Sequence, residues 1–143
     1  MPHTVEWYLE HRVLYVRATG IITLEEIKES DADGDRLLAE GDAPIHTIVE
    51  HVDVVKVPAS IQSIRQAMSH LGHPDMGWII LVSSQRSIWS YVGQIIAQMA
   101  MIPFRRFDTM GEALAFLNEV DPSLLPLLRE RASTQIIHKK QAG

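Results

Sequence analysis

Three polar side chains able to transfer protons lie close together near position 50. Glu50, His51 and Asp53 stand at the carboxyl end of a predicted strand, Ile45 to Val52. Ligands of open α/β sheets gather at that edge, and a carboxylate beside an imidazole can act as general acid and base. A strand that reaches solvent also ends in polar residues, so the cluster has a purely structural explanation too. We predict no catalytic residue and no enzymatic activity.

Asp31, Asp33 and Asp35 alternate like the first ligands of a calcium-binding loop. Such a loop needs glycine at its sixth position and a bidentate glutamate at its twelfth. Arg36 and Asp42 occupy those two positions, so the register fails. We therefore expect the three aspartates on the solvated face of a helix.

A second group with the side chains of a metal site comprises His70, His73 and Asp75. Imidazole and carboxylate ligands suit zinc or nickel. The three residues span Gly72 and Pro74, which end a predicted helix, and a helix exit needs polar residues in any case. We predict neither a metal nor a cofactor.

Three serines, Ser83, Ser84 and Ser87, follow an apolar segment and precede a predicted helix. Hydroxyl groups at a helix N-terminus can hold a phosphate. The glycine-rich motifs of nucleotide-binding loops and the nucleophile elbow of hydrolases are both absent from the sequence. Their absence argues against the common nucleotide-binding and hydrolase functions.

The apolar segment before these serines, Trp78 to Val82, has no solvent face. This pattern is typical of a strand at the centre of a parallel sheet that helices cover on both sides. The rest of the chain alternates strands and helices, which favours an α/β layered domain with right-handed crossovers. We predict a mixed sheet, because the first strand forms an antiparallel hairpin with the second.

The predicted elements begin and end at residues that favour such boundaries. Thr23 and Glu26 form a capping box, and Asp121 with Pro122 has the pattern of an N-cap before the first helical residue. In chain order the elements are a hairpin (Val5 to Leu9, Arg12 to Ala18), a helix from Thr23 towards Gly41, a strand (Ile45 to Val52), a helix from Ile61 to Leu71, a strand (Trp78 to Val82), a helix from Ser87 to Met101, a strand (Phe104 to Phe107), a helix (Thr109 to Val120) and a terminal helix to Ile137.

Three stretches of the chain resemble the STAS-like fold of the sporulation anti-anti-sigma factor, and more closely a group of small bacterial proteins described as SpoIIAA-like. They are Arg12 to Glu26, Trp78 to Ser83 with the helix that follows, and Phe104 to Leu117. These are packing patterns, so they imply a fold and are nearly silent on activity. The resemblance implies one STAS-like α/β domain over residues 1–120 and an additional C-terminal helix and tail over residues 121–143.

Proteins similar to the anti-sigma antagonists dock a partner kinase and are switched by phosphorylation of a serine in an Asp-Ser-Ser/Thr-Gly turn. The matching segment here is Asp53 to Ile61, which lacks the Asp-Ser pair and the glycine. Pro58 also fixes a backbone torsion there. The resemblance leaves Ser60 as the candidate phosphate acceptor, and the alternative role of Ser60 is the N-cap of the next helix.

Composition narrows the classes of partner. A chain of 143 residues fits one domain, and its net charge of −5 argues against nucleic acid, which attracts cationic surfaces. The absence of cysteine is typical of a reducing compartment. The first nine residues lack a secretory signal, and the apolar runs are shorter than the ~20 residues that span a bilayer. We predict a cytoplasmic protein without a membrane span.

The predicted helix from Ser87 to Met101 has an apolar surface around roughly half of its circumference. A helix that packs on one sheet needs a stripe only ~100° wide. On this surface lie Trp89, Val92, Ile96 and Met99, our candidate interface or pocket residues. The terminal helix and a second copy of the chain are both candidates to cover them.

Two functions from different classes remain. The first is a non-enzymatic protein-interaction or regulatory module of the STAS-like type, which binds itself as a homodimer or binds another protein. The alternative is a protein that binds a small apolar ligand or lipid in a pocket between the sheet and the helices. In that case the terminal helix, which contains Pro126, is a candidate movable cover.

Overall fold

A five-stranded mixed sheet forms the centre of the molecule. The computed structural model describes residues 3–58, 60–68, 73–84 and 88–142. The strands lie in the order β1-β2-β3-β4-β5, with β1 antiparallel to β2 and all other neighbours parallel. This confirms the predicted α/β fold with its N-terminal hairpin. The strands are β1 (His3–Leu9), β2 (Val13–Ile21), β3 (Ile45–Lys56), β4 (Met76–Val82) and β5 (Phe104–Phe107).

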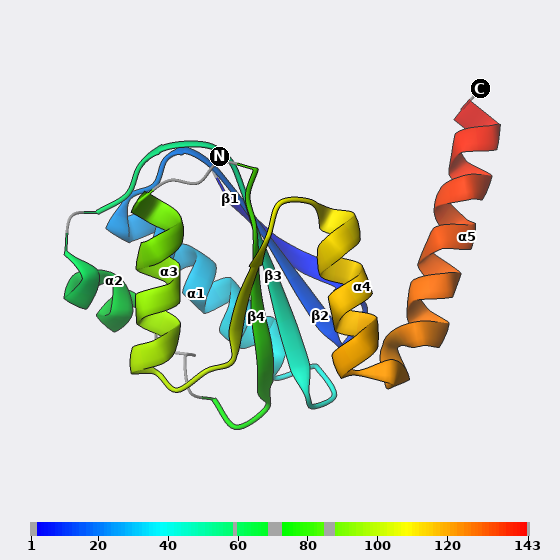
Figure 1. Ribbon diagram of the computed structural model, residues 1–143, viewed down its shortest axis with the longest axis horizontal. Helices are drawn as coiled ribbons and strands as arrows, with labels where there is room; N and C mark the ends of the chain where they lie inside the picture. The colour runs from blue at the N-terminus through cyan, green and yellow to red at the C-terminus, as the bar shows by residue number, and fades with distance from the viewer. Residues whose placement is uncertain (1–2, 59, 69–72, 85–87, 143) are drawn as a thin grey trace.

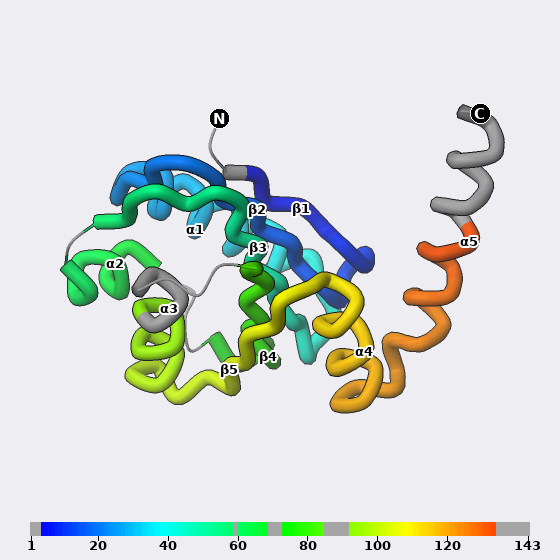
Figure 2. The backbone as a smooth tube through the Cα atoms, turned by 45° about the horizontal axis from the view of Figure 1, so that its top comes forward, coloured from blue at the N-terminus to red at the C-terminus, as the bar shows by residue number. Residues whose placement is uncertain are grey.

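The helices divide between the two sides of this sheet. They are α1 (Leu24–Leu38), α2 (Ile61–Ala67), α3 (Ile88–Met99), α4 (Met110–Val120), the short 3₁₀ helix η1 (Pro122–Leu124) and α5 (Leu125–Ala142). Successive parallel strands are added in one direction, so right-handed crossovers place their three helices α1, α2 and α3 on the same side. Figures 1 and 2 show these helices together, with α4 and α5 on the other side.

Capping residues begin several of the helices, and that of α1 is the predicted capping box. The Thr23 hydroxyl accepts a hydrogen bond from the Glu26 N–H, and the Glu26 carboxylate accepts one from the Thr23 N–H. Thr109 caps α4 through the Glu112 N–H. Asp121 occupies the predicted N-cap position with Pro122 directly after it, but its side chain makes no capping hydrogen bond, because its carboxylate bonds elsewhere.

The predicted length and place of some elements also need correction. Strand β3 extends to Lys56, and the described part of α2 ends at Ala67. Strand β4 is an interior strand between β3 and β5, but β3 is the middle one. The apolar strand β4 therefore lies inside the sheet, with a neighbour on each side, but it is not the central strand as predicted.

The side of the sheet under α4, η1 and α5 is densely packed, and we call it the filled face. Its fully buried side chains include Ile48, Ile80 and Leu117. Trp78 from β4 meets Phe116 from α4 edge to face, with ring centroids 4.9 Å apart. This face supplies the main continuous core of the molecule.

A carboxylate at the start of η1 ties the C-terminal region to the sheet. Asp121 Oδ2 accepts a hydrogen bond from Arg12 Nη2 and lies 2.8 Å from His46 Nε2, and Ser123 donates to Asp121 Oδ1. His46 Nδ1 accepts from the Trp78 N–H at 3.0 Å, so the ring carries its proton on Nε2 and donates it to Asp121. We call these contacts the Asp121 clamp.

The clamp also requires a glycine in β4. A Cβ atom at Gly77 would lie only 2.5 Å from His46 Nδ1. Glycine is therefore the residue that lets the His46 ring approach the backbone of β4. Burial opposes ionisation of Asp121, but hydrogen bonds from Ser123 and His46 and the charge of Arg12 outweigh it and lower the pKa of this carboxyl group.

Helix α5 leaves the body of the molecule after its first turns. Arg131 stacks on the Tyr8 ring at 3.8 Å and donates a hydrogen bond to the Tyr8 carbonyl oxygen at 3.0 Å. Figure 1 shows the C-terminal part of α5 standing away from the sheet. Within the described residues, no helix has the length and apolar character needed to cross a membrane.

Candidate functional site

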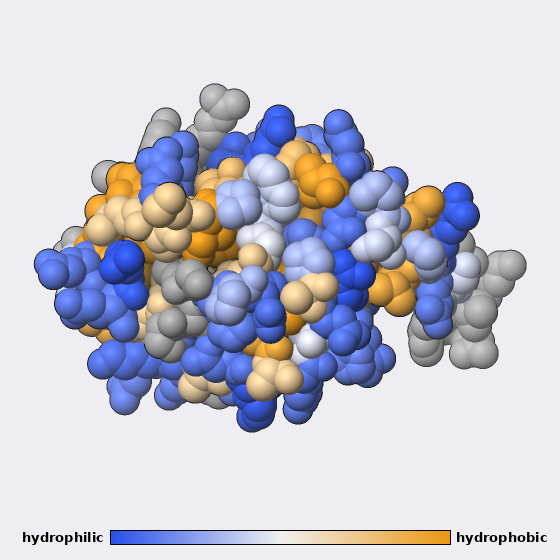
Figure 3. Space-filling view, turned by 90° about the horizontal axis from the view of Figure 1, so that it is seen from below, coloured by the Kyte–Doolittle hydropathy of each residue, from blue (hydrophilic) through white to orange (hydrophobic). Residues whose placement is uncertain are grey.

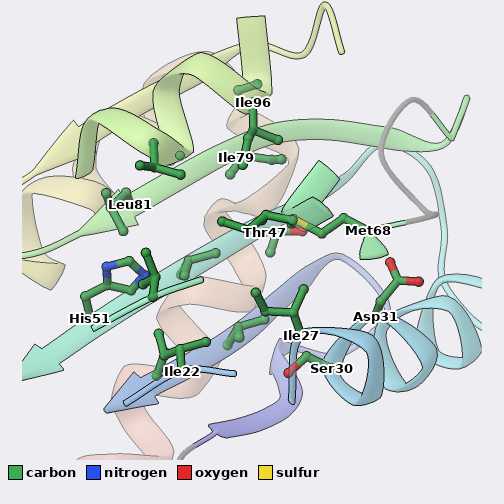
Figure 4. A pocket seen from close by; sticks show the side chains of 18 of the residues that line it. Ile22, Ile27, Ser30, Asp31, Thr47, His51, Met68, Ile79, Leu81 and Ile96 are labelled. Atoms are coloured by element: carbon green, nitrogen blue, oxygen red, sulfur yellow. The ribbon is translucent and has the colours of Figure 1, made fainter. Parts of the chain in front are cut away.

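The side of the sheet under α1, α2 and α3 contains a cavity of about 200 Å³, and we call this side the hollow face. Apolar side chains make most of its wall, with Ile79 and Leu81 from β4, Ile27 from α1, Ile64 from α2 and Ile96 from α3. Figure 4 shows how these helices and strands surround the space. The pocket therefore has the apolar walls that are typical of a small-molecule site.

The alternation of side chains along β3 explains which residues enter the pocket. Successive side chains of a strand point to opposite sides of the sheet. Thr47, Val49 and His51 line the pocket, whereas Ile48 packs in the core of the filled face. Two of the three residues that β3 contributes are thus polar.

Thr47 is the most deeply placed of these polar groups. Its side chain is 5% exposed, and its hydroxyl oxygen is buried without a hydrogen-bond partner among the described residues. Buried hydroxyl groups are normally hydrogen-bonded, because desolvation without a partner is unfavourable. Thr47 therefore presents an unused donor and acceptor to the pocket.

His51 lies at one end of the pocket, with Thr47 between it and Asp31 (Figure 4). Burial lowers the pKa of His51 below the ordinary value of 6.5. The imidazole is therefore neutral at pH 7, with one nitrogen that can donate and one that can accept a hydrogen bond.

Helix α1 supplies the remaining polar groups of the pocket, Glu26, Ser30 and Asp31. Asp31 is only 7% exposed. The prediction that all three aspartates of this helix lie on its solvated face is therefore wrong for Asp31. Asp33 is partly exposed and pairs with Arg36 at 3.4 Å, in agreement with that prediction.

Glu50 and His51 do not form an acid–base pair. The Glu50 carboxylate accepts a hydrogen bond from the Tyr15 hydroxyl, whereas His51 lines the pocket. Burial and the Glu50 carboxylate raise the pKa of Tyr15. Asp53 is exposed at a positive φ of 51°, beyond both residues. Adjacent strand residues point to opposite sides, so the sequence neighbours are separated by the sheet.

Ser60, the candidate phosphate acceptor, is exposed at the start of α2. Its hydroxyl oxygen accepts a hydrogen bond from the Ser63 N–H at 3.2 Å. The side chain thus occupies the N-cap position, which is the alternative role predicted for it, and its function as a phosphate acceptor stays a prediction.

The candidate residues of α3 have different surroundings. Val92 and Ile96 line the pocket, whereas Met99 is 52% exposed. The side chain of Trp89 lies outside the described residues. Neither Figure 1 nor Figure 2 places α5 near α3, and α5 contributes nothing to the described pocket lining. The predictions that the terminal helix covers α3 and that it is the movable cover of the pocket are therefore both wrong.

The other predicted clusters are only partly covered by the described residues. His70 and Ser87 lie outside them. His73 Nδ1 accepts a hydrogen bond from the Asp75 N–H at 3.1 Å, and Ser83 is buried beside Arg106, which donates to its carbonyl oxygen. In the ranges that the structure describes, no three His, Asp or Glu side chains are grouped closely enough to hold a metal ion.

Thr47 is a residue of the pocket that was not predicted from the sequence. Its signal is that Thr47 and His51 are polar and lie on the same side of the strand as the apolar Ile45 and Val49. A cavity itself leaves no such signal, because it depends on how side chains from distant segments meet.

Comparison with known proteins identifies the fold. No protein-family model and no curated protein matches the sequence. An uncharacterised protein of the DUF3478 family from Shewanella loihica, whose crystal structure shows a SpoIIAA-like fold, is similar to this chain with a TM-score of 0.59 and 14% identity. The match covers 80% of this chain and 91% of that one. The protein therefore has a SpoIIAA-like fold, as the sequence patterns predict.

Proposed function

We propose that the protein binds a small apolar molecule in the pocket of the hollow face. The observation that carries this proposal is the apolar cavity of about 200 Å³ between the sheet and α1, α2 and α3. The interior of a folded domain is normally filled to the density of an organic crystal. A space of this size removes packing contacts and lowers stability, so a ligand that fills it gains those contacts on binding.

The volume limits the size of the ligand. An engineered cavity of ~150 Å³ with apolar walls admits benzene, and pockets for drug-sized ligands have ~300–1,000 Å³. The present cavity lies between these values. A molecule with one or two rings, or a short aliphatic chain, fits this range better than a two-chain lipid.

The test is to fill the pocket from inside. Val49 lies at the middle of the β3 lining, so Val49→Phe should occupy the space and abolish the binding of toluene and naphthalene. Val55→Phe adds the same atoms to the same strand at a side chain that is 69% exposed, and it should leave binding unchanged. Titration calorimetry measures the affinity of the wild-type protein and of both variants for the two compounds.

Two results would contradict the proposal. One is the absence of saturable binding of both compounds to the wild-type protein. The other is equal affinity in the wild-type protein and Val49→Phe, since the compounds would then occupy another place. Circular dichroism of each variant shows that the fold is intact.

Self-association is a second candidate function, and it is favoured by an exposed apolar patch formed by α3 and by Met101, two residues after the end of α3. Ile95 and Met99 are 41% and 52% exposed, and Met101 is 91% exposed. Figure 3 shows apolar side chains gathered at the end of the molecule that carries α3. Native mass spectrometry separates the candidates, because a homodimer without adduct supports self-association and a monomer with a retained apolar adduct supports ligand binding.

A further inference from the structure

We propose that the occupant of the pocket is an uncharged molecule with a single hydroxyl group, which hydrogen-bonds to Thr47, and that carboxylates are excluded. This inference rests on the proposed ligand-binding function and adds the chemical class of the ligand. It depends on three observations, which concern the Thr47 hydroxyl, the charge of the residues that line the pocket, and the separation of Thr47 and His51 along β3.

The Thr47 hydroxyl is the first observation. It lies on the pocket side of β3, is buried, and has no protein partner among the described residues. A ligand without polar atoms would leave this group unpaired, whereas a ligand hydroxyl can both donate to it and accept from it. The Thr47 hydroxyl therefore favours a ligand that can form a hydrogen bond with it.

The charge of the lining is the second observation. Glu26 and Asp31 contribute carboxyl groups, and no lysine or arginine is found among the described residues that line the pocket. His51 is neutral at pH 7, because burial lowers its pKa. A ligand carboxylate would lose its hydration, find no cation, and lie near groups of its own charge. Fatty acids and aromatic acids are therefore poor ligands.

The third observation is the separation of Thr47 and His51 along β3. They are four residues apart on this strand, which places their Cα atoms about 13 Å apart at ~3.3 Å per residue. A molecule with one ring cannot reach both. Thr47 is the more buried of the two, so it is the group that a ligand must satisfy.

Three ligands of one shape test this assignment. Toluene, p-cresol and 4-methylbenzoate share a methyl-substituted ring and differ in the absence of a polar group, a hydroxyl or a carboxylate. We expect p-cresol to bind the wild-type protein about fivefold more tightly than toluene, which is the ratio given by a hydrogen bond of about average strength. We expect no saturable binding of 4-methylbenzoate. Titration calorimetry at pH 7.5 gives the dissociation constants of all three ligands.

The matched variants are Thr47→Val and Thr47→Ser. Valine has the shape of threonine without the hydroxyl, so the preference should reverse and toluene should bind more tightly than p-cresol, whose hydroxyl would then be desolvated without a partner. Serine keeps the hydroxyl, so the Thr47→Ser variant should retain the preference for p-cresol. A merely structural role of Thr47 would change the affinity of both compounds together.

The outcomes separate the inference from the function on which it rests. If neither toluene nor p-cresol binds, the proposed ligand-binding function is wrong. If both bind but p-cresol has no advantage, or if Thr47→Val keeps the advantage, the assignment of Thr47 is wrong while ligand binding stands. Binding of 4-methylbenzoate as tight as that of p-cresol would overturn the exclusion of carboxylates.

Discussion

The two sides of the sheet differ in how completely their side chains fill the space beneath the helices. On the filled face, Ile48, Ile80, Leu117 and Leu124 are fully buried in one cluster. On the hollow face, residues of the same strands surround a cavity of about 200 Å³. The two sides of one sheet are therefore packed differently: the filled face supplies the main continuous core, and the hollow face leaves the space in which we propose that a ligand binds.

The largest expected effect comes from shortening a leucine on each side. Leu117→Ala, at a residue that is 0% exposed, should lower the free energy of unfolding by about 4 kcal/mol. Leu81→Ala, at a residue that is 3% exposed beside the cavity, should cost only about 2 kcal/mol, because Leu81 already lacks contacts on its pocket side. Urea unfolding followed by circular dichroism measures both values. Equal costs would show that the two sides are packed equally well.

An intermediate effect is expected at the Asp121 clamp. Asp121→Asn keeps the shape of the side chain but removes its charge and one of its two acceptor oxygens, which weakens the hydrogen bonds with Arg12 and His46, so stability at pH 7 should fall by about 2 kcal/mol. Asp108→Asn is the matched control, because Asp108 is exposed and pairs with Arg106 at the surface; its cost should stay below about 0.5 kcal/mol.

The clamp also predicts a dependence of stability on pH. The pKa of Asp121 is lower in the folded protein than its ordinary value of 3.8. Its contribution is therefore fully present above about pH 5 and is lost as the pH falls through the folded pKa. Urea unfolding between pH 7 and pH 3 should show a smaller loss for Asp121→Asn than for the wild-type protein. Parallel curves would exclude Asp121 as a source of acid sensitivity.

The smallest expected effect is that of Thr47→Val, and the matching change on the filled face has the opposite sign. Thr47→Val removes a buried hydroxyl without a partner, so the ligand-free protein should become more stable by about 1 kcal/mol. Val13→Thr places such a hydroxyl on the filled face, where Val13 is fully buried, and should destabilise by about 1–3 kcal/mol. Thermal unfolding measures the stability of each variant relative to the wild-type protein. Destabilisation by Thr47→Val would mean that the hydroxyl is already satisfied in the free protein.

Most of the fold can be predicted from local signals in the sequence. The capping box at Thr23, the cap at Thr109 and the apolar strand at Trp78 to Val82 each depend on residues close together in the chain. Such signals survive in the folded protein because local and tertiary preferences agree. The order of strands and helices follows from them.

The errors arise where distant segments decide the outcome. Asp121 has the pattern of a helix cap, but Arg12 and His46 compete for its carboxylate and are more than 70 residues away. Asp31 has the pattern of a solvated helix residue, but α1 turns it towards the pocket. The site is predictable only to the extent that Val92 and Ile96 belong to an unusually wide apolar surface of α3.

The Asp121 clamp joins side chains 109 positions apart, from the N-terminal hairpin to the segment after the last strand. During synthesis, Arg12 and His46 emerge long before the carboxylate that they bind, so the clamp cannot close on a growing chain that ends before residue 121. Contacts across so long a loop form slowly, because chain entropy must be lost before any bond is gained. A protein truncated at residue 120 would accordingly keep every strand yet leave a guanidinium and an imidazole without their shared acceptor.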